Sequence, residues 1–95
     1  MSPQPVADSI QRKLTDGLAP LRLAVIDQSH LHAGHAGARP GGESHFRVEI
    51  VSARFRGLSR MDRQREVHRL LAAELAGPVH ALSIAAQTPE EVAAA

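Results

Sequence analysis

The sequence lacks several residue types and patterns, and each absence excludes a class of function. It contains no cysteine, no tryptophan and no tyrosine, and its only phenylalanines are Phe46 and Phe55. Without cysteine the 95-residue chain can form no disulfide, perform no thiol catalysis and supply no thiolate ligand. No apolar run approaches the ~20 residues of a membrane-spanning helix, and the first ten residues lack the pattern of a signal peptide. We therefore expect a cytoplasmic protein without a membrane partner.

An excess of charge of one sign is also missing. The chain carries 11 Lys and Arg residues against 10 Asp and Glu residues, so its bulk charge does not indicate a nucleic-acid partner. Hydrophobic residues make up 43% of the chain, which is enough for one modest core of two layers. We expect one domain over residues 1–95, with tails at 1–5 and 88–95 and a flexible loop, rich in His and Gly, at 29–43.

The spacing of apolar residues predicts the element order α-β-β-α-β, with a possible short final helix capped by Thr88. The first helix carries an apolar stripe and is expected to stop at Gly17 and Pro20, and the second is expected to run from a cap at Ser59 through Leu75. The predicted strands cover 21–27, 45–52 and 79–85. Alternation places three residues on one face of each strand: Leu21, Leu23 and Val25, then Phe46, Val48 and Ile50, then His80, Leu82 and Ile84.

The lengths of the connections predict the topology of a three-stranded mixed sheet. A loop of about fifteen residues favours antiparallel pairing of the first two strands, whereas a longer, helical connection favours a right-handed parallel crossover to the third. The first strand should then end, and the other two begin, at the same edge of the sheet. This edge collects five of the six histidines and excludes His68, which lies within a helix: His30, His32, His35, His45 and His80.

These histidines suggest a metal site, because neutral imidazole is a common ligand of zinc, copper and iron. Two or three of them would suit one Zn²⁺ with an open position, or one iron of a cluster. A cluster would also need thiolates, which would have to come from another molecule because this chain has none. The alternatives are ordinary ones: a solvated loop without ligands, a His45 that fixes the hairpin, and a His80 that is satisfied within the core.

A second group of polar residues is the arginine-rich segment between Arg54 and Arg69, which carries only Asp62 and Glu66 as acidic residues. Arg suits phosphate and carboxylate geometry, so this segment predicts a nucleic-acid or acidic-protein interface, or a solvated helix face with partial pairing. The scarcity of aromatic residues and the lack of a GXXG clamp argue against a KH-type nucleic-acid site. No nucleophile–base pair or carboxylate dyad is visible, so we expect no enzymatic activity.

Three stretches in combination resemble the BolA family: GGESHFRVEIVS at 41–52, RFRGLSRMDRQREVHRLLAAEL at 54–75 and PVHALSI at 78–84. IQRKL and LAVIDQSHLHAGH are similar to the family's opening helix, first strand and loop, so the resemblance covers roughly residues 6–90. It implies a class II KH-like α+β fold with helices packed on one face of the sheet. It also implies a monothiol glutaredoxin partner, with which the protein would share a bridging [2Fe–2S] cluster. A cysteine of the glutaredoxin and bound glutathione would supply the thiolates, and the isolated protein, which could form a homodimer, would hold no cluster.

The resemblance also implies ligands. The family's V-H-A-L motif places one ligand at His80. The loop ligand falls on His32 when counted from the first strand, and nearer His35 when counted back from the second, whereas His45 matches a motif residue that is structural or adjacent to a ligand. Some family members are transcriptional regulators that use the second helix. Here that role would fall to five arginines: Arg54, Arg56, Arg60, Arg63 and Arg65.

Overall fold

The computed structural model describes residues 4–29 and 42–94, so His30, His32 and His35 lie outside the described residues. The helices and strands follow the predicted order. They are α1 (Pro5–Leu18), β1 (Arg22–Asp27), β2 (His45–Val51), a short 3₁₀ helix η2 (Ala53–Phe55), α2 (Arg60–Leu70), α3 (Ala72–Ala76), β3 (Ala81–Gln87) and α4 (Pro89–Ala94). None of the helices within the described ranges is both long and apolar enough to cross a membrane.

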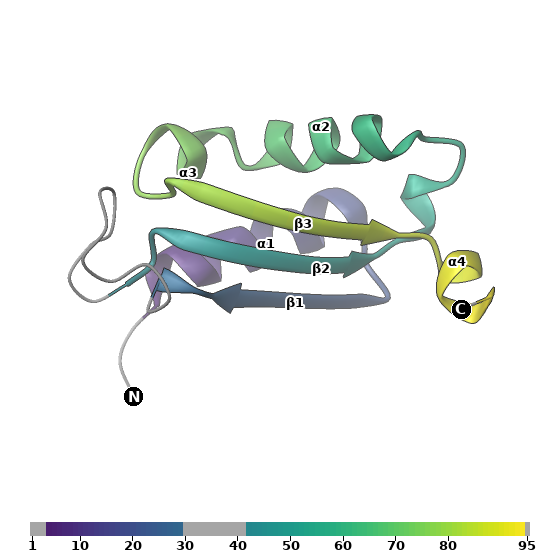
Figure 1. The fold of residues 1–95 in the computed structure, drawn as a ribbon, viewed down its shortest axis with the longest axis horizontal. Helices are drawn as coiled ribbons and strands as arrows, with labels where there is room; N and C mark the ends of the chain where they lie inside the picture. Colours follow the sequence, from purple (N-terminus) through teal and green to yellow (C-terminus); the bar gives the residue numbers. More distant parts are fainter. Residues whose placement is uncertain (1–3, 30–41, 95) are drawn as a thin grey trace.

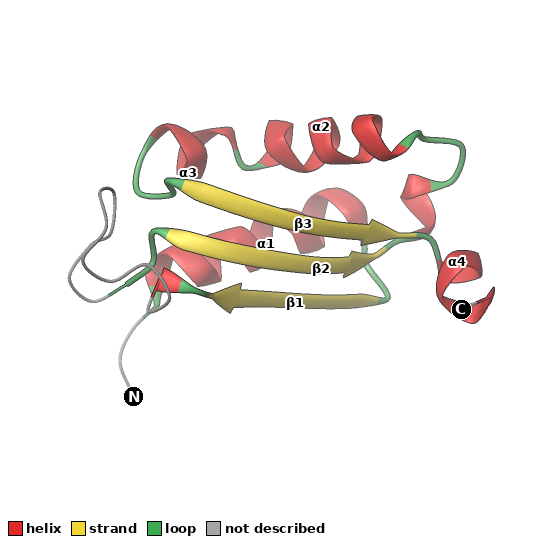
Figure 2. Ribbon diagram, viewed as in Figure 1, coloured by secondary structure: helices red, strands yellow, loops and turns green. Residues whose placement is uncertain are grey.

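The three strands form one sheet in the order β1-β2-β3, shown in Figure 1. β1 pairs with β2 in antiparallel register, and β3 pairs with β2 in parallel register. The predicted α+β fold with a three-stranded mixed sheet is therefore confirmed. In Figure 2, α1 lies behind the sheet and α2 runs alongside β3. Because the strand order is β1-β2-β3, β3 forms one edge of the sheet.

The core lies between the helices and one face of the sheet. Phe46, Val48 and Ile50 of β2 are at most 2% exposed, which confirms the predicted alternation of this strand. Helix α1 packs its buried stripe onto them, and Gly17 allows α1 to approach α2 closely. A Cβ atom at Gly17 would lie only 2.8 Å from two methyl carbons of Leu70. This glycine therefore serves helix packing, and α1 ends at Leu18, between the Gly17 and Pro20 that were predicted to stop it.

The inward face of β1 is shorter than predicted. Leu23 and Val25 pack against the core, but Leu21 is 75% exposed. The strand begins only at Arg22, and the backbone of Leu21 donates a hydrogen bond to the carbonyl oxygen of Val51 at the end of the ladder. Leu21 thus lies just before β1 and does not share the core-facing side of Leu23 and Val25, as the predicted strand over 21–27 had it.

The second helix is interrupted, although one continuous helix through Leu75 was predicted. Ser59 caps α2 as expected, since its hydroxyl accepts a hydrogen bond from the backbone of Asp62 at 3.1 Å. Leu71 then adopts φ −104° and ψ 21°, which separates α2 from α3. The break accompanies two buried side chains, Leu71 and Glu74, in adjacent turns. Although burial opposes it, hydrogen bonds to the Glu74 carboxylate, chiefly from Lys13, hold the pKa of this group below its usual value.

The C-terminal helix α4 is capped by hydrogen bonds at its first turn. The hydroxyl of Thr88 accepts from the backbone of Glu91 at 3.2 Å, and the carboxylate of Glu91 accepts from the backbone of Thr88 at 2.7 Å. This reciprocal arrangement is a capping box. The predicted cap at Thr88 is confirmed, and residues 89–94 of the expected tail are helical.

Candidate functional site

The topology brings together the end of β1 and the beginnings of β2 and β3. His45 is paired with Ala81 across the parallel ladder, and Asp27 is paired with Phe46 across the antiparallel one. The rings of His45 and His80 are stacked, with centroids 6.4 Å apart and planes 24° apart. The structure therefore brings these two predicted site residues together at one end of the sheet, where β1 ends and β2 and β3 begin. We call this end the histidine edge.

His80 lies one residue before β3 and is exposed. It was predicted within the strand, sharing a face with Leu82 and Ile84, but only those two residues pack against the core. The interpretation of His80 as a satisfied core histidine is therefore excluded. The backbone N–H of His80 donates to the carbonyl oxygen of Ser44 at 2.7 Å, so its backbone is held in place while its imidazole faces solvent.

His45 is 8% exposed, and its ring, its backbone N–H and its carbonyl oxygen each have a hydrogen-bonding partner. Its Nδ1 lies 2.8 Å from the hydroxyl oxygen of Ser44, and its backbone N–H donates to the hydroxyl oxygen of Ser29 at 3.1 Å. Its carbonyl oxygen accepts from the backbone of Gln28 at 2.7 Å. These contacts fit the structural role considered for His45, with its ring bonded to a neighbouring hydroxyl.

Two buried serines organise this edge and were missed by sequence reasoning. The hydroxyl oxygen of Ser29 accepts from the backbone N–H groups of Ser44 at 2.9 Å and His45 at 3.1 Å. The two serine hydroxyls lie 3.3 Å apart, and both residues are at most 5% exposed. A buried N–H without an acceptor costs free energy, so Ser29 fixes the start of β2. Through Ser44 it also fixes the position of His80.

Glu43 extends this network to the first helix. Its carboxylate accepts from the backbone N–H groups of Val6 at 3.1 Å and Ala7 at 3.0 Å, two donors in the first turn of α1 that the helix itself cannot satisfy. Its own N–H donates to the carboxylate of Asp27 at 2.9 Å. Glu43 does this from a left-handed conformation with φ 62°, which is uncommon for a residue other than glycine. The residues that carry the E-S-H-F resemblance thus hold α1, β1, β2 and β3 together.

The described residues of the histidine edge do not form a complete set of metal ligands. Within residues 4–29 and 42–94 there is no group of three or more His, Cys, Asp or Glu side chains that could hold a metal ion. At the histidine edge, the described residues offer one exposed imidazole, His80, with His45 beside it. The chain also contains no cysteine, so it supplies no thiolate to an iron–sulfur cluster.

At the opposite end of the sheet, most of the predicted anion-binding arginines already have partners. Arg63 is 9% exposed and was predicted to face a ligand. Its guanidinium donates to the carbonyl oxygens of Leu58 and Ala86 and to the Glu91 carboxylate, the last at 2.6 Å, and lies 6.0 Å from the ring centroid of Phe55. Because these contacts hold the guanidinium of Arg63 within the fold, the prediction that Arg63 binds an anion is wrong. The hydrogen bond from Arg63 also lowers the pKa of Glu91 to about 2.

The other four arginines of this set are exposed. Arg56 donates to the carboxylate of Glu90 at 2.7 Å, which raises the pKa of the guanidinium, and Arg65 pairs with Asp62 at 3.2 Å. Arg54 donates to a backbone carbonyl of α1 at 3.3 Å. Among the residues that the structure describes, the Arg60 side chain has neither a hydrogen bond nor an ion pair. The other arginines are largely paired, so the segment presents far less free positive charge than its sequence suggests.

Comparisons with known proteins agree with the fold. The family model described as BolA-like protein matches residues 14–91. BolA-like protein 1 of Homo sapiens is 51% identical over 87 residues, covering 92% of this chain, which spans only 61% of that relative. The protein named DNA-binding transcriptional regulator BolA in Vibrio cholerae is 43% identical over 86 residues, covering 90% of this chain and 77% of the relative. The solved BolA domain of SufE1 from Arabidopsis thaliana superposes with a TM-score of 0.85 at 42% identity, covering 95% of this chain and 99% of that domain.

Proposed function

This chain belongs to the BolA-like protein family, and we propose that it is an adaptor that binds a monothiol glutaredoxin and lends histidine ligands to a shared [2Fe–2S] cluster. The observation that carries the proposal is the exposed imidazole of His80, whose backbone is fixed at the histidine edge of a chain without cysteine. The adaptor would serve iron–sulfur trafficking or iron-homeostasis regulation in the cytoplasm, without enzymatic activity of its own.

The exposure of His80 and the groups that support it favour the proposed ligand role. A ligand to a shared cluster has to face the partner, and among the two histidines described at the edge only His80 is exposed. Its N–H is held by the carbonyl oxygen of Ser44, so the main chain that presents it does not have to be ordered when the partner binds. The neighbouring ring of His45 and the hydroxyl of Ser44 support this position from the protein side.

The need for a partner follows from what the chain cannot supply, and the resemblance to the BolA family implies that this partner is a monothiol glutaredoxin. A [2Fe–2S] cluster stores one electron and requires four ligands. Two of them would come from this chain, and the other two would be thiolates from the glutaredoxin and glutathione. The second ligand from this chain is proposed to be His32 or His35. The cluster would be absent from the isolated protein, which could instead form a homodimer.

Reconstitution tests the proposal. The protein is mixed with a monothiol glutaredoxin, glutathione, ferrous iron and sulfide, and the cluster is followed by visible absorption and circular dichroism. We expect His80→Ala to abolish or strongly change the spectrum of the complex, while His68→Ala, a change at an exposed histidine of α2, leaves it unaltered. His32→Ala and His35→Ala, made separately, identify the loop ligand. An unchanged spectrum with His80→Ala would show that the ligand assignment is wrong.

A second candidate function is DNA binding, which is favoured by the name of the Vibrio cholerae relative and by the arginine-rich segment. Because Arg63 is buried, the residues to test are Arg60 and Arg65, both exposed on α2. A DNA-binding role predicts affinity that falls steeply with salt, and each lost phosphate contact should reduce the slope of log affinity against log salt by about 1. Gel-shift titrations of wild type, Arg60→Ala and Arg65→Ala across a salt series measure this. Absent or salt-insensitive binding would exclude the regulator.

A further inference from the structure

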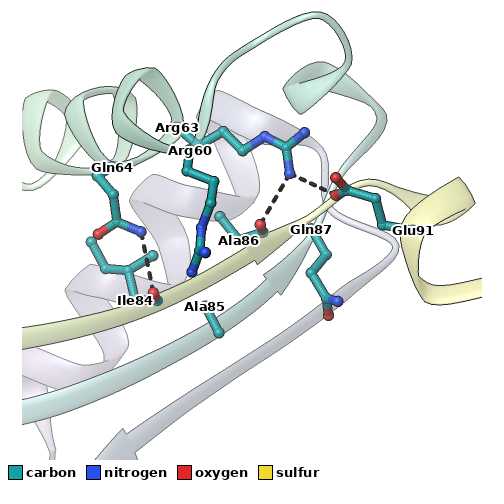
Figure 3. A pocket seen from close by; sticks show the side chains of 8 residues that line it. All are labelled: Arg60, Arg63, Gln64, Ile84, Ala85, Ala86, Gln87 and Glu91. Atoms are coloured by element: carbon teal, nitrogen blue, oxygen red, sulfur yellow. Dashed lines mark hydrogen bonds and ion pairs between the residues drawn. The ribbon is translucent and has the colours of Figure 1, made fainter. Parts of the chain in front are cut away.

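A groove runs along the outer edge of β3, at the end of the sheet away from His80. It has a volume of about 440 Å³ and lies between the first two turns of α2, residues 84–87 of β3, and Glu91 of α4. Figure 3 shows these side chains around it. The volume lies within the range of about 300–1,000 Å³ that is typical of ligand sites. We call this feature the β3-edge groove.

The backbone of β3 supplies polar groups to this groove. The carbonyl oxygens of Ile84 and Ala86 face α2, where they accept hydrogen bonds from Gln64 and Arg63, each at 3.2 Å. In a strand the N–H and C=O groups of one residue point to the same side, so the N–H groups of Ile84 and Ala86 also point away from β2. Because β3 is an edge strand, no strand among the described residues lies on that side.

Arg60 differs from the other arginines of α2. Within the described part of the chain, each of the others is paired with a carboxylate: Arg63 with Glu91, Arg65 with Asp62 and Arg69 with Glu66. Arg60 is exposed and has no such partner. In Figure 3 its side chain extends from α2 toward β3, near Ala85. The groove therefore combines outward backbone donors with one uncommitted guanidinium.

We propose that the β3-edge groove docks an extended acidic peptide segment of a partner protein. Backbone carbonyls of the segment accept from the N–H groups of Ile84 and Ala86, and one of its carboxylates binds Arg60. The bonds from Gln64 and Arg63 to the strand's carbonyls remain in place. Main-chain pairing with a sheet edge gives such docking its affinity, and a charge-assisted bond to Arg gives it selectivity. This binding surface is additional to the histidine edge and does not depend on the proposed cluster.

The groove fits a peptide better than a nucleic acid. Nucleic-acid binding requires several phosphate contacts, but Arg60 is the one uncommitted cation among the described residues that line the groove. None of those lining residues is aromatic, so bases would have no ring to stack on. The carboxylate of Glu91 at one end disfavours a run of phosphates, but it leaves room for a single acidic side chain next to Arg60.

A titration of the ¹⁵N-labelled full chain, followed by NMR, tests the proposal. The probe is a terminally blocked pentapeptide, Thr-Val-Asp-Val-Thr, and its control carries Asn in place of Asp. We expect the amide signals of Ile84 and Ala86 to shift while that of His80 does not. Arg60→Gln should weaken the Asp peptide about fivefold or more and bring it to the affinity of the Asn control. Arg65→Gln, which removes an exposed charge five residues away on α2, should leave the affinity unchanged.

Three outcomes would overturn the proposal. The first is that neither amide signal shifts. The second is equal binding of the Asp and Asn peptides with no effect of Arg60→Gln, which would remove the charge recognition. The third is that an octamer of deoxythymidylate shifts the same amide signals more strongly than the peptide, with affinity that falls steeply with salt. That result would make the groove a nucleic-acid site.

Discussion

At the histidine edge, buried hydroxyl and backbone groups hold the chain while the imidazole of His80 stays exposed; at the arginine end, carboxylates already occupy most of the guanidinium groups. In both regions the sequence gathers side chains of one type, histidine in the first and arginine in the second. In the first, the neutral serine network satisfies backbone donors and leaves the His80 side chain exposed. In the second, Glu90 and Glu91 of α4 bind Arg56 and Arg63. A cluster of one residue type in the sequence therefore indicates a binding site only when its side chains are not already bonded to neighbouring residues.

The largest expected effect is at the arginine end. Replacing Arg63 with Ala leaves the carbonyl oxygen of Ala86 without this donor and removes the cation that lies over Phe55. We expect a loss of about 2–3 kcal/mol in the free energy of unfolding, measured by urea denaturation. Arg65→Ala is the matched control, and its exposed ion pair should contribute at most about 0.5 kcal/mol. Similar losses for the two variants would mean that Arg63 is an ordinary surface arginine, and that the contrast between the two regions fails.

A somewhat smaller effect is expected from the serine network. Ser29→Ala removes the acceptor of two backbone N–H groups, and we expect it to destabilise the fold by about 1–2 kcal/mol. Because the same change loosens the carbonyl oxygen of Ser44 that holds His80, it should also weaken the proposed cluster complex. Ser83→Ala, at an exposed serine on β3, should change stability by less than about 0.5 kcal/mol. If Ser29→Ala behaves like this control, the serines do not organise the histidine edge.

The smallest effect concerns the pH dependence of the α4 contact. The pKa of Glu91 is lowered from 4.5 to about 2, first by the hydrogen bond from Arg63 and then by that from the backbone of Thr88. A carboxyl group with a depressed pKa in the folded state stabilises the fold fully above its unfolded value and loses this contribution as the pH falls toward 2. We therefore expect wild type and Glu91→Gln to differ modestly in unfolding free energy at pH 6 and to converge near pH 2. A difference that stays constant over this range would contradict the assigned contact.

Local patterns made much of the fold predictable. The alternation of Phe46, Val48 and Ile50 and the lengths of the two connections were enough to derive the strand faces and the topology. The caps at Ser59 and Thr88 could be predicted because donor and acceptor lie three residues apart in the chain. Such features depend on neighbours in sequence, which the sequence displays directly.

Features that depend on distant residues were missed. Glu43 caps a helix 36 and 37 residues away, and no local pattern distinguishes it from a solvated glutamate. Arg63 resembles the arginines beside it, and only the positions of β3 and α4 reveal that it is buried. The convergence of His45 and His80 was nevertheless predictable, because it follows from the order of the strands.

The measurement that tests the central claim most directly is pulsed electron paramagnetic resonance of the reduced cluster in the complex with glutaredoxin, prepared with ¹⁵N-histidine in this chain alone. It detects nitrogen atoms bonded to iron. We predict that His80→Ala lacks one strong nitrogen coupling that is present in wild type, and that His68→Ala retains it. The same set of nitrogen couplings in wild type and His80→Ala would contradict the claim that this exposed histidine is a ligand.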